Sequence, residues 1–454
     1  MRYDLAQYNK QLFSLTIPLV VEQVLRISMS NVNIFLLGRY SDAAVASVGV
    51  ANQYVNLGQM LLTLAATGAA VVISQYIGAD DRKRANMSAQ VTLLISFAMS
   101  LIICPLLIFF AQPLLGLAGI GAELLPDAII FMRIVGGTLF VHGAFSAFSA
   151  MCRCFGFPRL PMYGIILMNV LNFTGTFITV QMSKTHVFDV VMTIAWINAL
   201  SAFAGLALLV FFVVRYVGIS FSPALLRPFP FRLVREVLNI GLPSGMESVS
   251  YNVMQIVTTN MISGLGVVVL SAKAYLSSVT AYTYILGMCF GQANQLIVAQ
   301  LTAAGKLDEA SALVKRNFRI NLTMNLCVAL VVFILRKPIF GLFTNSAAVI
   351  ALAGGVLLID ILVECGRALG HCFNLALRSV GDVRFTMSMM LASTWLLCVP
   401  LCYLLAVRLD LGLYGIWIAF VADEWLRGGA ACFRWCANKW RPRMLARISL
   451  LQNS

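Results

Sequence analysis

Charged residues are scarce in this chain of 454 residues: Asp, Glu, Lys and Arg make up only 11%, while hydrophobic residues make up 60%. Soluble domains usually contain about 25% charged residues. So few polar side chains cannot cover a water-exposed fold. The composition therefore excludes a disordered chain, a disulfide-rich secreted domain and a soluble enzyme. An integral membrane protein is the class that remains.

Histidine is equally scarce, with three residues, and none of the eleven cysteines shows the Cys-x-x-Cys spacing of a zinc site. Most cysteines lie inside apolar runs, where a thiol behaves as a small hydrophobic group. The sequence also lacks a Ser/Lys dyad or a paired-Asp motif that an intramembrane enzyme would need. We therefore expect no enzyme, no metal centre and no cofactor.

The apolar residues gather into twelve runs, and a helix needs about 20 such residues to cross a bilayer. These runs are 11–36, 44–70, 89–112, 127–151, 161–181, 189–214, 236–262, 266–292, 317–335, 348–371, 386–407 and 412–433. The first of them lacks the small-residue cleavage site of a signal peptide, so we interpret it as the first span.

The formal net charge of +14 is distributed between these runs. With a cytoplasmic N-terminus, most of the 32 Lys and Arg residues fall in cytoplasmic loops and tails. The outer loops then hold only Arg39, Lys184, Arg336, Lys337 and Arg408. Because cytoplasmic loops are enriched in Lys and Arg, we predict a multi-pass protein of the inner (cell) membrane with both termini in the cytoplasm. Basic residues spread over loops do not form the one-sided patch of a nucleic-acid binder, and we expect no nucleic-acid partner.

Similar residues recur at a constant offset of 225 positions. The matching pairs are Pro18/Pro243, Glu22/Glu247, Gln75/Gln300, Pro113/Pro338, Arg153/Arg378, Gly156/Gly381, Arg159/Arg384 and Met162/Met387. A single register over the whole half indicates a duplicated unit. Each copy holds six runs, so both copies enter the membrane from the same side, as in transporters built from parallel repeats. We predict a first lobe at 1–214, a cytoplasmic linker at 215–235 and a second lobe with a basic tail at 236–454.

Six segments distributed along the chain resemble one family. They are IPLVVEQ, VNIFLLGRYSDAAVASVGVANQ, SQYIGADDRKRA, MCRCFGFPRLPM, GLPSGMES and LALRSVGDVRFTM. Together they resemble the MATE (multidrug and toxic compound extrusion) transporters. The resemblance implies an all-α membrane fold of twelve helices in two six-helix lobes forming a V. It also implies a monomer in the lipid bilayer that exports organic cations and amphipathic drugs, driven by inward flow of H⁺ or Na⁺.

The first half departs from this family at its cation site. Many members carry an Asp in the first span where this sequence has Asn33, and a second carboxylate one turn after the Asn that matches Asn172, where this sequence has Thr176. These side chains, together with Asn169, still offer oxygen ligands to a cation, but none of them carries a proton. A site of the family type in the first half is therefore in question.

Ionisable side chains inside spans are costly, so each is a candidate for function. Glu22 and Glu247 occupy equivalent repeat positions, each four residues after a proline that frees a backbone carbonyl. Burial favours the protonated form of a carboxyl group, which allows it to load and release a proton. For Glu22 the alternative is a structural pair with Arg26 at i+4. Glu247 has no basic residue at this spacing, so we predict a coupling role for it.

Asp360 and Glu364 lie one helical turn apart in the tenth span and form a candidate site for a shared proton or a cation. The alternative is a structural pair between Glu364 and Arg367. For three further ionisable groups inside spans, we expect a structural contact and no role in coupling. These are Lys273 with a carboxylate of the second half, Asp423 and Glu424 with Arg427 at the membrane surface, and His371 with a packing partner.

The chain is rich in Phe (29), Met (20) and Tyr (13), side chains that accept flat, amphipathic cations. In the eighth span the candidates for a drug-binding surface are Tyr275, Tyr282 and Met288. Asn169 and Gln53 are the polar candidates of the first half. For any one of these residues, packing against lipid or the protein core is the alternative.

Two other transporter classes also fit six plus six spans. A lipid-linked saccharide flippase of the same superfamily needs a more cationic cavity for pyrophosphate, whereas here the in-span carboxylates rival the basic groups. A major facilitator porter should carry G-x-x-x-D-R-x-G-R-R after its second span, and GADDRKRA lacks that spacing. The antiporter is therefore our first hypothesis and the flippase is the alternative.

Overall fold

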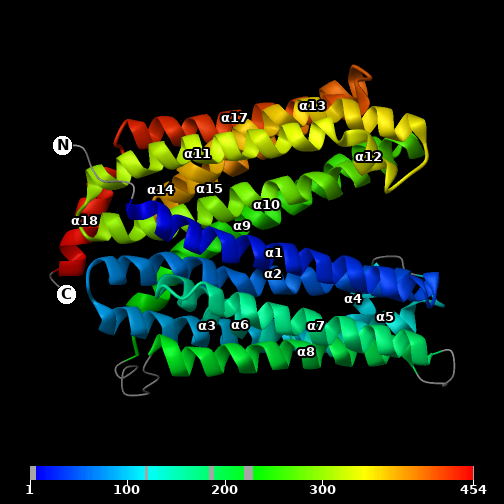
Figure 1. The fold of residues 1–454 in the computed structure, drawn as a ribbon, viewed down its shortest axis with the longest axis horizontal. Coiled ribbons are helices and arrows are strands. Elements are labelled where there is room, and N and C mark those ends of the chain that lie inside the picture. The colour runs from blue at the N-terminus through cyan, green and yellow to red at the C-terminus, as the bar shows by residue number, and fades with distance from the viewer. Residues whose placement is uncertain (1–6, 118–120, 184–188, 219–228, 453–454) are drawn as a thin grey trace. The chain divides into compact units, whose positions relative to one another are not determined.

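The computed structural model describes residues 7–117, 121–183, 189–218 and 229–452, and over these ranges it is helical with no β-strand (Figure 1). The first half contains α1 (Gln7–Gly38), α2 (Asp42–Gly78), α3 (Arg82–Phe109), α4 (Ala111–Leu117), α5 (Leu125–Gly137), α6 (Leu139–Cys154), α7 (Arg159–Met182), α8 (Val190–Phe212) and the π-helical η1 (Val213–Val217). The second half contains α9 (Phe231–Ser263), α10 (Val267–Ala303), α11 (Leu307–Ile334), α12 (Arg336–Gly341), α13 (Ala347–Leu369), η3 (Gly370–Asn374), α14 (Leu375–Ser379), α15 (Val383–Ala392), η4 (Ser393–Cys398), α16 (Val399–Cys402), η5 (Tyr403–Arg408), α17 (Gly412–Cys436) and α18 (Arg441–Gln452).

Within the described ranges, nine helical segments are long and apolar enough to cross a membrane. The remaining predicted spans coincide with α9, α10 and α17, which have 33, 37 and 25 residues. These three helices are long enough to cross a bilayer but carry more polar side chains. Every predicted run therefore coincides with a helical segment of span length, and the all-α membrane fold is confirmed.

The helices repeat with the offset of 225 found in the sequence. Helices α2 and α10 both have 37 residues and begin at Asp42 and Val267, and helices α3 and α11 both have 28 residues and begin at Arg82 and Leu307. The two halves differ where α6 is one continuous helix but its counterpart is interrupted by η3. A π-helical insertion of this kind often accompanies a functional site.

The predicted linker at 215–235 lies partly outside the described residues, which omit 219–228. Its described end is helical: α9 already begins at Phe231, and Arg232 pairs with Glu236 at 3.3 Å. The seventh helical segment therefore starts before the predicted span at 236, because an i, i+4 ion pair supports its first turn.

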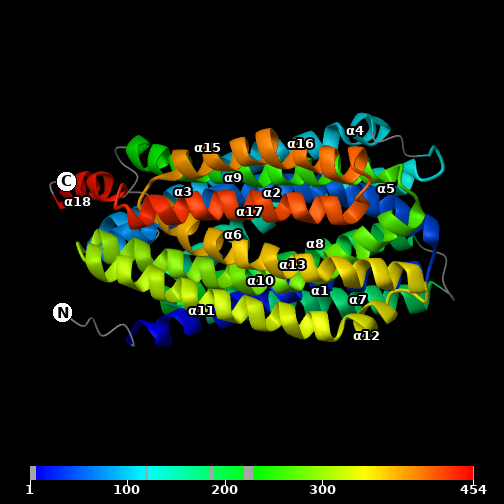
Figure 2. The same cartoon turned by 90° about the horizontal axis from the view of Figure 1, so that it is seen from above.

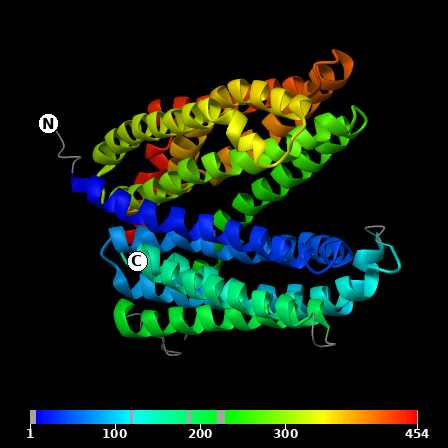
Figure 3. The same ribbon diagram turned by 45° about the vertical axis from the view of Figure 1, so that its right-hand side comes forward.

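Contacts divide the chain into two compact units. Unit 1 comprises Met1–Thr16, Ser74–Asp80 and Pro243–Ser454, and unit 2 comprises Ile17–Ile73 and Asp81–Leu242. Each unit has its own apolar core. In unit 1, α10, α11 and α13 pack against one another and run side by side (Figure 2). In unit 2, α7 packs along α8 and α3 packs against α5 and α6 (Figure 3). The assignment of 1–214 and 236–454 to separate lobes stays a prediction.

The same turn ends α6 and α14. Gly156 and Gly381 have φ values of 88° and 80°, a left-handed conformation that favours glycine. The following amides donate to carbonyls five residues back, Phe157 to Cys152 at 2.7 Å and Asp382 to Leu377 at 2.9 Å. This pattern is a Schellman motif. It stops each helix one residue after an arginine, Arg153 in one half and Arg378 in the other.

Candidate functional site

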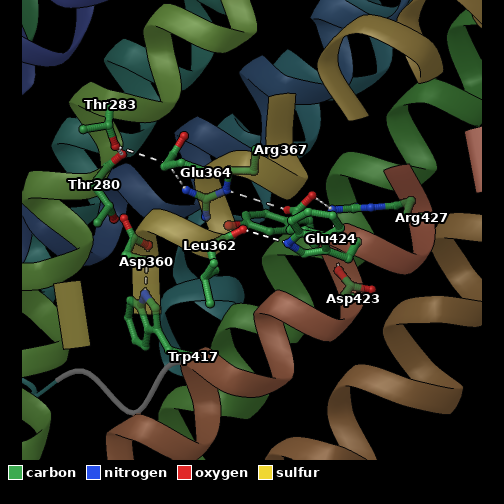
Figure 4. A network of polar contacts seen from close by, with 12 residues as sticks. Thr280, Thr283, Asp360, Leu362, Glu364, Arg367, Trp417, Asp423, Glu424 and Arg427 are labelled. Carbon is green, nitrogen blue, oxygen red and sulfur yellow. Dashed lines mark hydrogen bonds and ion pairs between the residues drawn. The ribbon is translucent and has the colours of Figure 1, made fainter. Parts of the chain in front are cut away.

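The two predicted carboxylates of α13 are buried in unit 1, with exposed fractions of 3% for Asp360 and 0% for Glu364. Trp417 Nε1 donates to Asp360 Oδ1 at 2.9 Å. Arg367 Nη1 donates to Glu364 Oε1 at 2.6 Å, and Thr283 Oγ1 donates to the same oxygen at 3.2 Å (Figure 4). The predicted pair between Glu364 and Arg367 is therefore present, and Asp360 has an indole N–H as its partner.

Helix α17 adds three more charged side chains to this group. Arg367 Nε lies 3.7 Å from Glu424 Oε1, and Arg427 Nη2 lies 2.6 Å from Glu424 Oε2 and 3.5 Å from Asp423 Oδ2 (Figure 4). Asp423 also accepts a hydrogen bond from Ser393. The predicted pairing of Asp423 and Glu424 with Arg427 is present, and their place at the membrane surface stays a prediction. Both are buried near the middle of α17, because Arg367 on a neighbouring helix balances part of their charge.

These six residues form what we call the carboxylate network, which consists of Asp360, Glu364, Arg367, Asp423, Glu424 and Arg427. It contains four carboxylates and two guanidinium groups, so two negative charges lack a positive counterpart when every group is ionised. An unbalanced buried charge is strongly unfavourable. The network therefore has capacity to bind positive charge.

Lys273 does not supply that charge, contrary to its predicted pairing with a carboxylate. Its Nζ donates to Thr259 Oγ1 at 2.7 Å, to Thr258 Oγ1 at 3.1 Å and to the Gln255 carbonyl at 3.4 Å. These partners are on α9, so the ammonium group is held by hydroxyl and carbonyl oxygens at the helix pair α9–α10.

A small pocket opens beside the network. Its lining residues come from α9, α13 and α17, and they are Tyr251, Met254, Gln255, Arg367, Phe420, Asp423 and Glu424. Two of the network's carboxylates and one guanidinium therefore border a space with room for about one water molecule.

The glutamate that lies four residues after Pro18 or Pro243 forms a buried ion pair with an arginine in each half. Arg153 Nη1 lies 3.2 Å from Glu22 Oε2 in unit 2, and Arg378 pairs with Glu247 in unit 1. Thr386 Oγ1 also donates to Glu247 at 3.3 Å. The interpretation of Glu247 as an unpaired carboxylate is therefore wrong. Its partner lies 131 positions away in the sequence, so inspection of neighbouring positions on the helix missed it, although the offset of 225 marks both arginines.

Glu22 makes the predicted contact with Arg26 at 3.5 Å in addition to the pair with Arg153. The duplicated pair joins the first helix of each half to the turn that follows the fourth. Because both partners are mostly buried, each pair fixes where that turn sits on the first helix.

Reversing the charge of Arg378 is expected to destabilise the protein by about 3–5 kcal/mol, because two negative groups then face each other in a buried site. Adding Glu247→Arg to Arg378→Glu should restore most of this loss. Chemical unfolding in detergent measures both effects, and Arg384→Glu is the control because Arg384 is exposed. Strictly additive losses in the double variant would show that the pair contributes no coupling energy.

The candidate cation ligands of the first half lie on α1 and α7 of unit 2. Asn172 and Thr176 are buried, with exposed fractions of 1% and 0%, and their side-chain polar atoms have no hydrogen-bond partner within the described residues. Asn33 Oδ1 is also buried and also has no hydrogen-bond partner within the described residues. Asn169 instead donates to its own helix at Ile165, and Gln53 is exposed on α2. A binding role for these five stays a prediction.

The aromatic candidates lie on α10. Tyr275 is half-buried with its ring centroid 5.4 Å from that of Phe343, and Tyr282 is 41% exposed. Their spacing of seven residues places both on one face, whereas Met288 lies about a third of a turn away from that face. The helix therefore does not place all three on a single surface, and their role in substrate binding stays a prediction.

Comparison with known proteins identifies relatives over the whole chain. A family model described as MatE matches residues 18–178 and 243–404, so the two matched segments begin at the repeat-related Pro18 and Pro243. The chain is 32% identical to the uncharacterized transporter YisQ of Bacillus subtilis over 96% of both chains. It is 22% identical to the probable multidrug resistance protein NorM of Thermotoga maritima, over 97% of this chain and 95% of that one.

Solved structures with the same fold include the MATE transporter VcmN of Vibrio cholerae in its bent form. It superposes with a TM-score of 0.87 at 17% identity and covers 98% of this chain and 99% of its own. A multidrug resistance MATE family transporter in an outward-facing conformation gives a TM-score of 0.85 at 17% identity, covering 98% and 97%. At this identity the likeness concerns the fold alone.

Proposed function

The chain belongs to the MatE family of membrane transporters, and from this premise we propose that it exports organic cations and amphipathic compounds in exchange for inward-moving protons. The observation that carries the proposal is the excess of two carboxylates over guanidinium groups in the carboxylate network. Protons that bind there neutralise a charge that the interior of a membrane protein otherwise tolerates poorly.

Two features favour H⁺ over Na⁺ as the coupling ion. Arg367 and Arg427 each lie within 2.6 Å of a network carboxylate, so a metal cation entering the network would meet like charges. A proton instead binds one carboxylate oxygen and removes a charge without needing several ligands. Glu364 Oε2 is a suitable acceptor, because it is buried and has no partner within the described residues.

In the proposed cycle, protonation from the outer side prepares the network for the inward-open state, and release to the cytoplasm restores its negative charge. Electrostatic attraction by the recharged network then favours the next cationic substrate. The small pocket beside Arg367, Asp423 and Glu424 brings water, and with it protons, next to the same carboxylates. The protein would act as a monomer in the inner membrane, with both termini in the cytoplasm.

Each of the two carboxylates without a positive counterpart can bind one proton, so the network can carry two protons per cycle. Exchange of two protons for one monovalent cation moves one net positive charge inward, so the membrane potential contributes about 2.3 kcal/mol per 100 mV to each cycle. Exchange of one proton for one cation would move no net charge. The stoichiometry therefore distinguishes a potential-driven exporter from one driven by the pH difference alone.

Proteoliposomes containing the purified protein, with ethidium as the organic cation, test the proposal. An imposed pH gradient is expected to drive ethidium transport, and a valinomycin-clamped potential of matching sign should accelerate it further. An equal Na⁺ gradient at constant pH should have no effect. Transport driven by Na⁺ alone would overturn the choice of ion, whereas no response of any cation substrate to either gradient would overturn the exporter itself.

A further inference from the structure

A stripe of buried carboxamides runs along α11. Asn317, Asn321 and Asn325 follow one another at four-residue spacing, with exposed fractions of 0%, 0% and 2%. Residues at i and i+4 lie on one face of a helix. Asparagine is mostly exposed in folded proteins, so three in a row within one helix interior require a reason.

Helix α10 presents a matching face to this stripe. Asn294 Oδ1 accepts a hydrogen bond from Asn317 Nδ2 at 2.8 Å. Further along α10, a Cβ on Gly287 would lie 2.6 Å from Asn325 Nδ2, and one on Gly291 would lie 2.5 Å from the His371 carbonyl oxygen. The two glycines therefore keep α10 close to α11 and to η3.

The third side of this polar region is η3. Asn321 Nδ2 donates to Cys372 Sγ at 3.6 Å, and the His371 ring packs edge-on against Tyr284 at 5.1 Å between centroids. The π-helical turn that presents His371 and Asn374 has no counterpart in α6. The three elements therefore enclose a polar column in unit 1, which we call the asparagine seam. It consists of Asn294, Asn317, Asn321, Asn325, His371 and Asn374.

The seam contains an unusual number of buried polar atoms without partners. Within the described residues, these atoms are Asn294 Nδ2, Asn317 Oδ1, Asn321 Oδ1, both polar atoms of Asn325, His371 Nε2 and Asn374 Oδ1. Buried donors and acceptors in native proteins are almost always satisfied, and ordered water fills the role where protein groups do not. A buried group of unpartnered donors and acceptors suits a line of water molecules.

One end of the seam reaches the carboxylate network. Thr283 donates to Glu364 and lies one helical turn before Gly287 on the same face of α10. From Thr283 to Asn294, α10 rises by about 16 Å. The other end, at Asn317, lies at the level of Lys315, Arg316 and Arg319, the basic cluster that marks the cytoplasmic side of α11.

The first half lacks both parts of this arrangement. At the positions 225 residues earlier, Leu139 replaces Glu364, and Thr92, Ser96 and Ser100 replace the three asparagines. Thr92 and Ser100 donate to their own helix backbone, at 2.7 Å each. Network carboxylates and paired carboxamides therefore occur together in the second half and are absent together from the first.

We propose that the asparagine seam holds a line of ordered water that carries the coupling proton from Glu364 to the cytoplasm. The inference rests on the proton coupling proposed above. Glu364 transfers its proton to the nearest water, and the proton passes along the line to bulk water. The carboxylate that remains is held by Arg367 and Thr283.

Radiolytic hydroxyl-radical labelling of the intact protein in nanodiscs, read by mass spectrometry, detects bound water next to buried side chains. Cys372 accepts a hydrogen bond from the seam residue Asn321, whereas Cys152 and Cys398 lie outside the seam, and all three have exposed fractions of 0%. Cys372 should be oxidised several-fold faster than the other two. Equal rates at the three thiols would overturn the proposal.

Blocking the seam provides a second test. Asn321→Leu should lower labelling of Cys372 and slow proton release to pyranine about tenfold, because it removes the unpartnered Asn321 Oδ1 that would bind water. Asn321→Ser should keep both near wild type, and Ser96→Leu, at the repeat-equivalent position, controls for a general effect of the larger side chain. Size-exclusion chromatography shows whether each variant folds. Unchanged Cys372 labelling in a folded Asn321→Leu variant would contradict the proposal that the seam holds a line of water.

The two proposals fail separately. Proton-driven ethidium transport with a dry seam would leave the exporter in place and overturn the water line. A hydrated seam in a protein whose transport ignores the pH gradient would overturn proton coupling, and with it the role assigned to the water.

Discussion

Replacement of Glu364 by Gln is expected to reduce pH-driven ethidium transport to the rate of protein-free liposomes. Glutamine keeps the size of the side chain and can still accept hydrogen bonds from Arg367 and Thr283, but it cannot bind and release a proton. The variant should therefore fold, since it also removes a buried negative charge. Proteoliposome transport under an imposed pH gradient measures the loss.

Ethidium binding should survive this substitution better than transport does. Aromatic and aliphatic contacts to a flat cation are independent of Glu364, so equilibrium binding in detergent should weaken far less than coupled transport. Glu123→Gln is the matched control, because Glu123 is exposed and belongs to neither the network nor the seam. Wild-type proton coupling in Glu364→Gln would move the coupling role to Asp360 or to another carboxylate.

Replacement of Arg367 by Gln is expected to cost about 3–5 kcal/mol of stability, because it leaves buried carboxylates without their positive partner. Arg367 is the only residue that contacts carboxylates on both α13 and α17 among the described ion pairs of the network. Its removal leaves Glu364 with a single hydroxyl partner and Glu424 with Arg427 alone. Thermal unfolding in detergent measures the loss.

The pH dependence of this loss has a definite sign. Unpaired buried carboxylates favour their protonated form, so the folded variant binds more protons than the unfolded chain and gains stability as the pH falls. The deficit of Arg367→Gln against wild type should therefore be smaller in acidic buffer than in alkaline buffer. Arg319→Gln, at an exposed position of α11, should show no such trend. A deficit independent of pH would mean that Arg367 acts through packing and not through its charge.

Much of the molecule was predictable because its signals are local. A span is a run of apolar residues, so twelve runs indicated twelve helical segments. The pair between Glu364 and Arg367 follows from a spacing of three residues on one helix, and the contact between Glu22 and Arg26 follows from a spacing of four. The repeat offset also marked Arg153 and Arg378, although their pairing with Glu22 and Glu247 was not deduced.

Contacts between distant segments were not predictable in this way. Trp417 lies 57 positions from Asp360, and Glu424 reaches Arg367 from another helix. The spacing of Asn317, Asn321 and Asn325 is visible in the sequence, but nothing local indicates that their face meets α10 and η3. The buried position of Glu424 was missed for the same reason: its partner Arg427 is local, but its second partner, Arg367, comes from α13.

The sequence by itself determined that this chain is a duplicated helical membrane protein whose basic residues lie mostly between its apolar runs. Composition, run length and the offset of 225 are properties of the chain that no packing alters. Only the tertiary structure decided which of the rare charges balance one another. In a low-dielectric interior a charge is set by its neighbours within a few ångströms, and helix packing brings those neighbours from segments tens to hundreds of residues apart.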